Sequence, residues 1–173
     1  MVDLGWPGRM GELQASMRRV GVAMSEITYG LATHYHIDHA GLAQELKQNG
    51  MKLLVLETQK AAIPLMKQHV KPADNYVDIT LHDNVDITFA ESRAVLARIG
   101  LAGQIVATPG HSDDSVSLLL DDGCVFTGDL TTPMLAGEGD GPAVLASWRK
   151  LRDLGAHTVY PGHAPVHYFP AKD

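Results

Sequence analysis

The feature that most constrains this chain is a cluster of metal-binding side chains that follows an apolar run, Ile27 to Thr33. Four such side chains fall within six residues: His34, His36, Asp38 and His39. In a turn at the end of a strand, histidines two positions apart can converge on one cation, while the next two side chains point elsewhere and can hold a second. The alternative is that these are loop histidines with ordinary hydrogen bonds, but so dense a cluster rarely arises without ligation. The segment therefore predicts metal binding, with room for two ions.

Three further motifs supply metal-binding side chains downstream, each after an apolar run. They are Thr108-Pro-Gly-His111, Thr127-Gly-Asp129 and Tyr160-Pro-Gly-His163. In two of them a Pro-Gly pair breaks the strand, which lets the following histidine turn toward the end of the sheet.

The pattern H-x-H-x-D-H, followed in order by these three motifs, resembles the signature of the metallo-β-lactamase superfamily from about Val2 to Val166. The resemblance implies a first metal held by His34, His36 and His111. It implies a second metal held by Asp38, His39 and His163, with Asp129 bridging the two ions.

The order of the apolar segments predicts a mixed α/β fold, because strand and helix patterns alternate. Val116 to Leu120 and Cys124 to Thr127 flank Asp121-Asp-Gly123, which predicts a hairpin. The resemblance sharpens this to a single domain, 1–173, with the αββα sandwich of the metallo-β-lactamase type. The family's usual amino-terminal hairpin is expected to be absent, since the chain begins just before Asp3.

Three helix-like patterns accompany these strands. Leu13, Met17 and Val20 recur at helical spacing and predict a helix ending near Gly21, and Val144, Trp148 and Leu151 predict another. Pro64 is expected to shorten or kink a third, from Thr58. A Gly-rich loop, Thr131 to Pro142, follows Asp129 and is expected to contact substrate.

Composition excludes several classes of function. The chain has 173 residues, 45% of them hydrophobic, and a net charge of −6 without basic blocks, which argues against a nucleic-acid partner. No apolar run approaches the length that spans a bilayer. The single cysteine, Cys124, is expected to be a small core residue, and together with the absence of a leader pattern it predicts a cytoplasmic protein.

The ligand chemistry indicates the reaction. Imidazole and carboxylate without thiolate suit zinc, with iron or manganese as alternatives. Two cations bridged by Asp129 would lower the pKa of a water between them to about 7, which makes hydroxide the nucleophile, and Asp38 would orient that water or take its proton. The resemblance to the glyoxalase II and lactonase branches implies a small-molecule ester, thioester or lactone as substrate.

Two other functions stay open from the sequence. A mononuclear, iron-dependent sulfur dioxygenase shares parts of the same ligand pattern. A metal-binding module without turnover is the other alternative, since the amino-terminal strands are missing. Because their absence would leave a sheet edge unpaired, the sequence also predicts a homodimer or a higher oligomer.

Overall fold

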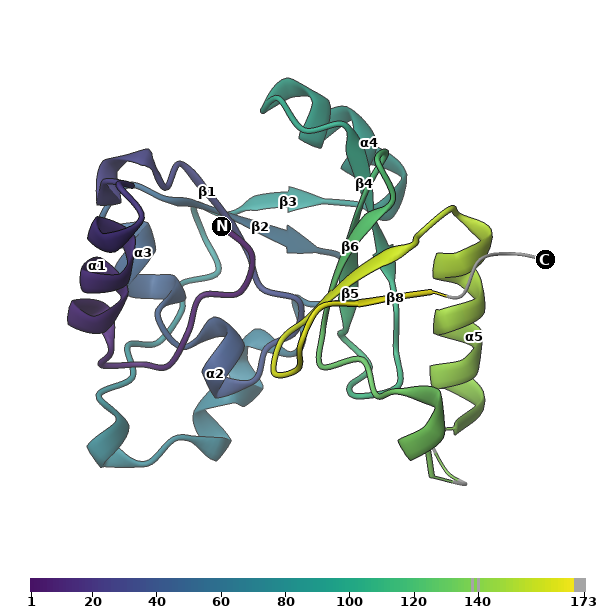
Figure 1. The fold of residues 1–173 in the computed structure, drawn as a ribbon. Coiled ribbons are helices and arrows are strands. Elements are labelled where there is room, and N and C mark those ends of the chain that lie inside the picture. Colours follow the sequence, from purple (N-terminus) through teal and green to yellow (C-terminus); the bar gives the residue numbers. More distant parts are fainter. Residues whose placement is uncertain (138, 140, 170–173) are drawn as a thin grey trace. The chain divides into compact units, whose positions relative to one another are not determined.

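A computed structural model describes residues 1–137, 139 and 141–169 (Figure 1). The chain divides into two compact units, Met1–Asp86 and Ile87–Asp173, referred to below as the amino-terminal and carboxy-terminal units. The first contains most of a three-stranded sheet of order β1-β2-β3, and the second contains a five-stranded sheet of order β4-β5-β6-β7-β8.

The amino-terminal unit combines short helices with its sheet. Its elements are α1 (Met10–Arg19), η1 (Met24–Glu26), β1 (Tyr29–Leu31), α2 (Ile37–Ala40), α3 (Ala43–Gln48), β2 (Lys52–Leu56), η2 (Ile63–His69), η3 (Pro72–Asp74) and β3 (Val85–Ile87), which ends at the first residue of the next unit. Strands β1 and β2 are parallel, with Gly30 opposite Leu53, and Val2 forms a parallel bridge to Leu31. The predicted strand from Lys52 to Leu56 is confirmed.

The core of this unit explains why these segments fold as they do. Leu42 and Leu46 are buried together with Leu53 and Val55 of β2. Each such aliphatic side chain stabilises the fold by roughly 1.5–3 kcal/mol on burial. Gly30 is required for close packing, because a Cβ there would clash with the sulfur of a buried methionine.

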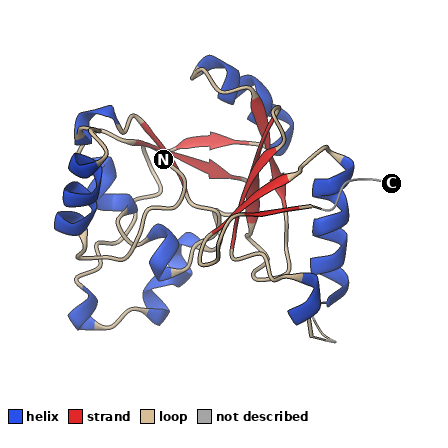
Figure 2. Cartoon of the chain, in the orientation of Figure 1, coloured by secondary structure: helices blue, strands red, loops and turns tan. Residues whose placement is uncertain are grey.

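The carboxy-terminal unit is built on the larger sheet (Figure 2). Its elements are α4 (Phe89–Arg98), β4 (Gly103–Ala107), β5 (Val116–Leu120), β6 (Cys124–Gly128), η4 (Pro133–Leu135), α5 (Gly141–Asp153), β7 (Thr158–Pro161) and β8 (His167–Tyr168). Strands β4, β5 and β6 pair antiparallel, β6 and β7 pair parallel, and β7 and β8 pair antiparallel.

Two predictions about this unit are confirmed. The Asp-Gly turn joins β5 to β6 as a hairpin, with Gly123 at a φ of 83°, a conformation that glycine adopts without strain. The predicted stripe of Val144, Trp148 and Leu151 lies on α5 and is buried against the sheet. This packing of α5 on the sheet stabilises the strand ends from which the loops emerge.

Other predictions need correction. Helix α1 ends at Arg19, and Val20 is 74% exposed instead of completing the apolar stripe, because it caps the helix. The predicted short helix around Pro64 is present, but it is the 3-10 helix η2, in which Pro64 lies in the first turn, where no backbone N–H donor is needed. Helix α2 and strand β8 were not predicted.

The predicted loop after Asp129 needs a smaller correction, because it contains the 3-10 turn η4. That predicted loop includes residues 138 and 140, which lie outside the described part of the chain. Within the described residues, no helix is long and apolar enough to cross a membrane.

Candidate metal centre

The ligand segment of the amino-terminal unit begins just after β1. His34 is buried, at 1% exposure, and His36 is exposed at the N-cap of α2. The Nε2 of His34 lies 3.0 Å from the Nδ1 of His36. The rings of these two histidines therefore lie side by side, while their predicted convergence on one cation stays a prediction.

The next two predicted ligands lie on α2, a helix of a single turn that begins after His36. Nε2 of His39 is 3.4 Å from Oδ2 of Asp38. The break in the backbone at His36 is what separates the two pairs of ligands, because the chain is extended there, at φ −92° and ψ 159°, and helical immediately afterwards.

Asp3 supports this segment from a distant part of the chain. Its Oδ1 accepts hydrogen bonds from the backbone N–H of Thr33 (2.8 Å) and from the Thr33 hydroxyl (2.9 Å). Its Oδ2 lies 2.9 Å from Nδ1 of His39. A carboxylate in this place fixes the ring orientation of a metal-binding histidine and directs the opposite nitrogen to the metal. The sequence feature that could have indicated this role is the position of Asp3 directly after the first apolar residues of the chain.

In the carboxy-terminal unit the predicted ligands follow the ends of three strands. Strands β6 and β7 are parallel neighbours, and the N–H of Gly162 donates to the carbonyl of Gly128 at 2.8 Å. Asp129 and His163 come directly after this bonded pair, so the sheet places them at the same edge. His111 follows β4.

The two oxygens of Asp129 face different histidines. Oδ2 lies 3.7 Å from Nε2 of His111, and Oδ1 lies 3.6 Å from Nε2 of His163. These distances are too long for hydrogen bonds. Two ligand atoms bound at roughly 2.0–2.2 Å to one cation with tetrahedral geometry lie about 3.3–3.6 Å apart. The spacing and the nitrogen and oxygen donors therefore fit divalent metal on both sides of this carboxylate.

The remaining histidines lie elsewhere. His69 and His82 are exposed, and His157 bonds through Nδ1 to the hydroxyl of Thr158 at 2.8 Å. Neither these three nor His167 belongs to a group of potential metal ligands within the described residues.

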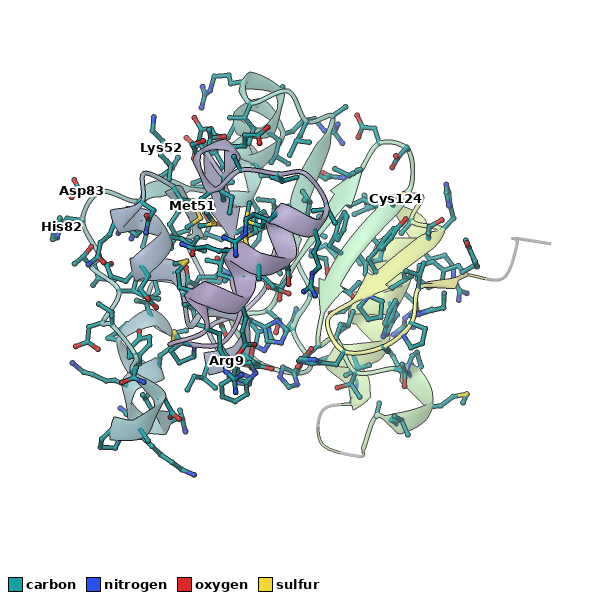
Figure 3. All side chains as sticks on the ribbon, turned by 60° about the vertical axis from the view of Figure 1, so that its left-hand side comes forward. Arg9, Met51, Lys52, His82, Asp83 and Cys124 are labelled. Atoms are coloured by element: carbon teal, nitrogen blue, oxygen red, sulfur yellow. The ribbon has the colours of Figure 1, made fainter. Side chains whose placement is uncertain are left out.

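Cys124, labelled on β6 in Figure 3, is half-buried, and in that respect the predicted core position is wrong. Cys124 is the first residue of β6 and lies on the less buried face of that strand, whereas its neighbour Val125 is in the core. Burial, with a contribution from Asp122, raises the pKa of its thiol. A raised pKa disfavours the thiolate, and so supports the prediction that this cysteine is no nucleophile.

The fold is shared with solved structures. The chain matches a metallo-beta-lactamase family protein of Thermus thermophilus with a TM-score of 0.72 and 22% identity, covering 95% of this chain and 64% of that one. It matches TTHA1623, solved in a di-iron-bound form, with a TM-score of 0.71 and 23% identity, covering 96% and 82%. Together with the two sheets and their helices, these matches confirm the predicted fold class.

The family follows from the sequence as a whole. A model of the metallo-beta-lactamase superfamily matches residues 1–163, and the chain belongs to that superfamily. It is 30% identical over 172 residues to the Beta-lactamase-like protein 2 homolog of Caenorhabditis elegans, covering 96% of this chain and 52% of that protein. It is 30% identical over 155 residues to a hydroxyacylglutathione hydrolase of Rhodopseudomonas palustris (strain BisB18), covering 86% and 52%.

A third relative is the Atrochrysone carboxyl ACP thioesterase of Aspergillus fumigatus, which is 30% identical over 138 residues, covering 79% of this chain and 38% of that protein. The chain thus spans about half the length, or less, of these curated relatives.

Proposed function

We propose that this chain is a metal-dependent hydrolase of a small ester, thioester or lactone, and that it holds two divalent cations. The observation that carries the proposal is the placement of Asp129, whose two oxygens face His111 and His163 at 3.7 and 3.6 Å. A carboxylate that presents each oxygen to a different imidazole is suited to bridging two ions.

The proposed ligand sets follow the family pattern. His34, His36 and His111 hold one cation, Asp38, His39 and His163 hold the other, and Asp129 bridges them. The pairs Asp38–His39, His111–Asp129 and Asp129–His163 lie 3.4, 3.7 and 3.6 Å apart, close to the spacing of two ligand atoms on one cation, and the pair His34–His36 is closer, at 3.0 Å. Zinc suits these donors, and iron is the first alternative, because TTHA1623 has the same fold and was solved with two irons.

The bound cations would polarise the substrate carbonyl and lower the pKa of water to about 7. Among the residues of the chain, Asp38 has the role of orienting that water and receiving its proton. Its carboxylate is partly buried and lies next to His39. Asp3, which accepts hydrogen bonds from Thr33, lies against the histidine of this pair and holds it in place.

The relatives favour one substrate class among the three. One is a hydroxyacylglutathione hydrolase and another is a thioesterase. Both act on an acyl group carried by sulfur, so we rank a thioester first.

Elemental analysis combined with a substrate panel tests the proposal. We expect close to two equivalents of metal, hydrolysis of thioesters, and loss of that activity on chelation. Asp129→Ala should lower occupancy at both sites, and His163→Ala should mainly empty one. His157→Ala is the matched control, since the ring of this exposed histidine bonds to the neighbouring Thr158 and belongs to neither group of potential ligands, and it should leave the metal content unchanged.

Three results would contradict this function. Hydrolysis that persists in the metal-free protein would refute a metal-dependent reaction. A single iron with oxygen consumption on a persulfide would establish the dioxygenase instead. Stable metal binding without turnover on any member of an ester, thioester, lactone, phosphodiester and β-lactam panel would indicate a non-catalytic module.

A further inference from the structure

Helix α5 packs on the larger sheet of the carboxy-terminal unit and bonds to the loops of two predicted ligands (Figure 1). One loop carries His111, and the other follows Asp129. Two adjacent side chains of α5, Ser147 and Trp148, make these bonds, and they are only 3% and 6% exposed. A buried polar group is costly when it has no partner, so both bonds are part of the packed interior.

Ser147 holds the loop that carries His111. Its hydroxyl donates to the carbonyl of Pro109 at 2.7 Å, two residues before the histidine. Gly110 lies so close to the helix that a Cβ there would be 2.6 Å from Cγ2 of Val144, and its φ of 141° favours glycine. The Pro-Gly pair before His111 therefore lies directly against one turn of α5 and is bonded to it.

Trp148 holds the chain that follows Asp129. Its indole N–H donates to the carbonyl of Thr131 at 2.7 Å. Between these two residues, Leu130 is buried in the same core as Trp148, and its N–H donates to the carbonyl of Thr127 at 3.2 Å. The turn that carries Asp129 is thus fixed by β6 on one side and by α5 on the other.

The geometry of the helix explains how neighbouring residues reach two loops. Successive residues are about 100° apart around the axis of an α-helix. Val144 is buried against the sheet, and Ser147 and Trp148, three and four positions later, lie on either side of its direction. One turn of helix therefore holds both loops, and the spacing of two adjacent side chains sets their separation. The resulting distance from Nε2 of His111 to Oδ2 of Asp129 is 3.7 Å.

We propose that Ser147 and Trp148 are positioning residues, which set the distance between His111 and Asp129 that a shared cation requires. The inference rests on the proposed metal centre and adds the residues that hold two of its ligands in register. Neither side chain binds metal or substrate. Ser147 acts through His111, and Trp148 acts through Asp129.

A two-step titration of the metal-free chain with cobalt(II) tests the inference, because absorption by bound cobalt reports affinity and coordination without any turnover. In the proposed ligand sets His111 serves one cation, whereas Asp129 bridges both. Ser147→Ala should therefore weaken one binding step about 2- to 10-fold, the effect of one hydrogen bond, and leave the other step unchanged. Trp148→Phe should weaken both steps, each about 2- to 10-fold.

Leu151→Val is the matched control on the same helix. Leu151 is fully buried one turn further on, and its side chain has no polar atom that could bond to a ligand loop. The loss of one methylene lowers the stability of the same core, and calorimetric unfolding of the metal-free proteins compares this loss with that of Ser147→Ala. Both cobalt steps should stay as they are in the parent chain. Equal weakening of both steps in Ser147→Ala, or the same weakening in Leu151→Val, would overturn the inference, because a general loss of stability would then explain it.

The titration also separates this inference from the proposed function. If no ester, thioester or lactone were cleaved while the variants showed these shifts, the hydrolase would fail and the positioning role would stand. If the parent chain hydrolysed substrate and both variants bound cobalt as tightly as the parent chain, the positioning role would be overturned and the hydrolase would stand. A parent chain that bound no cobalt would overturn both.

Discussion

Replacing Asp3 by Asn tests whether the Asp3 carboxylate sets the tautomer of His39 that can bind metal. The substitution keeps the shape of the side chain, and Asn tolerates the φ of 54° at this position. The amide oxygen can still accept both bonds from Thr33, which are 2.8 and 2.9 Å long in the parent chain. The amide nitrogen then takes the place of Oδ2, which lies 2.9 Å from Nδ1 of His39.

That exchange places a donor where His39 needs an acceptor. The imidazole must then carry its proton on Nε2, the nitrogen that faces Asp38. A protonated Nε2 cannot ligate a cation. Loss of such an outer contact typically weakens metal binding 10- to 100-fold, or about 1.4–2.7 kcal/mol.

Stability should respond differently from metal binding. The free energy of unfolding of Asp3→Asn should differ from that of the parent chain by less than about 1 kcal/mol, because both hydrogen bonds to Thr33 remain. Asp3→Ala loses both bonds and should cost roughly 1–3 kcal/mol. For a chain of this size each kcal/mol corresponds to about 2–4 °C in Tm.

A chelator-competition titration of the metal-loaded proteins, with calorimetric unfolding of the apo forms, measures both quantities. Asp86→Asn is the control, since this exposed carboxylate pairs with Lys60 on the surface and should leave metal affinity unchanged. If Asp3→Asn bound both metals as tightly as the parent chain, the carboxylate would have no part in setting the tautomer of His39.

Three further substitutions have direct outcomes. Lys47→Met should destabilise the chain by roughly 1–3 kcal/mol, because the ammonium donates to both oxygens of Thr80 at 2.9 and 3.0 Å. The substitution should also speed hydrogen exchange around Thr80, and an unchanged exchange rate would refute this reasoning. Trp148→Phe should cost about 1 kcal/mol in chemical denaturation, because the indole N–H donates to the carbonyl of Thr131 at 2.7 Å. Cys124→Ala should leave metal content and turnover unchanged, and a loss of turnover would restore the thiol as a candidate nucleophile.

The strongly patterned segments were predictable from the sequence. The Asp-Gly hairpin and the strand from Lys52 to Leu56 follow from local turn chemistry and an unbroken apolar run. The proximity of His34 and His36 was also predictable, since both lie on one short segment. All of these features are determined by residues that lie close together in the sequence.

What the sequence did not reveal depends on contacts between distant residues. Asp3 reaches Thr33 and His39 only because Val2 pairs with Leu31 in the sheet. Strand β8 has only two residues, too few to show a sequence pattern, and it is defined by its pairing with β7. The short helix α2 was missed because a single turn has no periodicity to detect.

The parallel pairing of β6 and β7 has a consequence for protein engineering. The bond between Gly162 and Gly128 fixes where Asp129 and His163 emerge, so their spacing is set by the sheet and does not depend on the chain that connects them. The part of the connecting segment that precedes α5 can therefore change in composition while both side chains keep their places, whereas α5 itself packs on the sheet through Val144, Trp148 and Leu151. Loop grafting between relatives could exchange substrate preference at this edge without rebuilding the ligands.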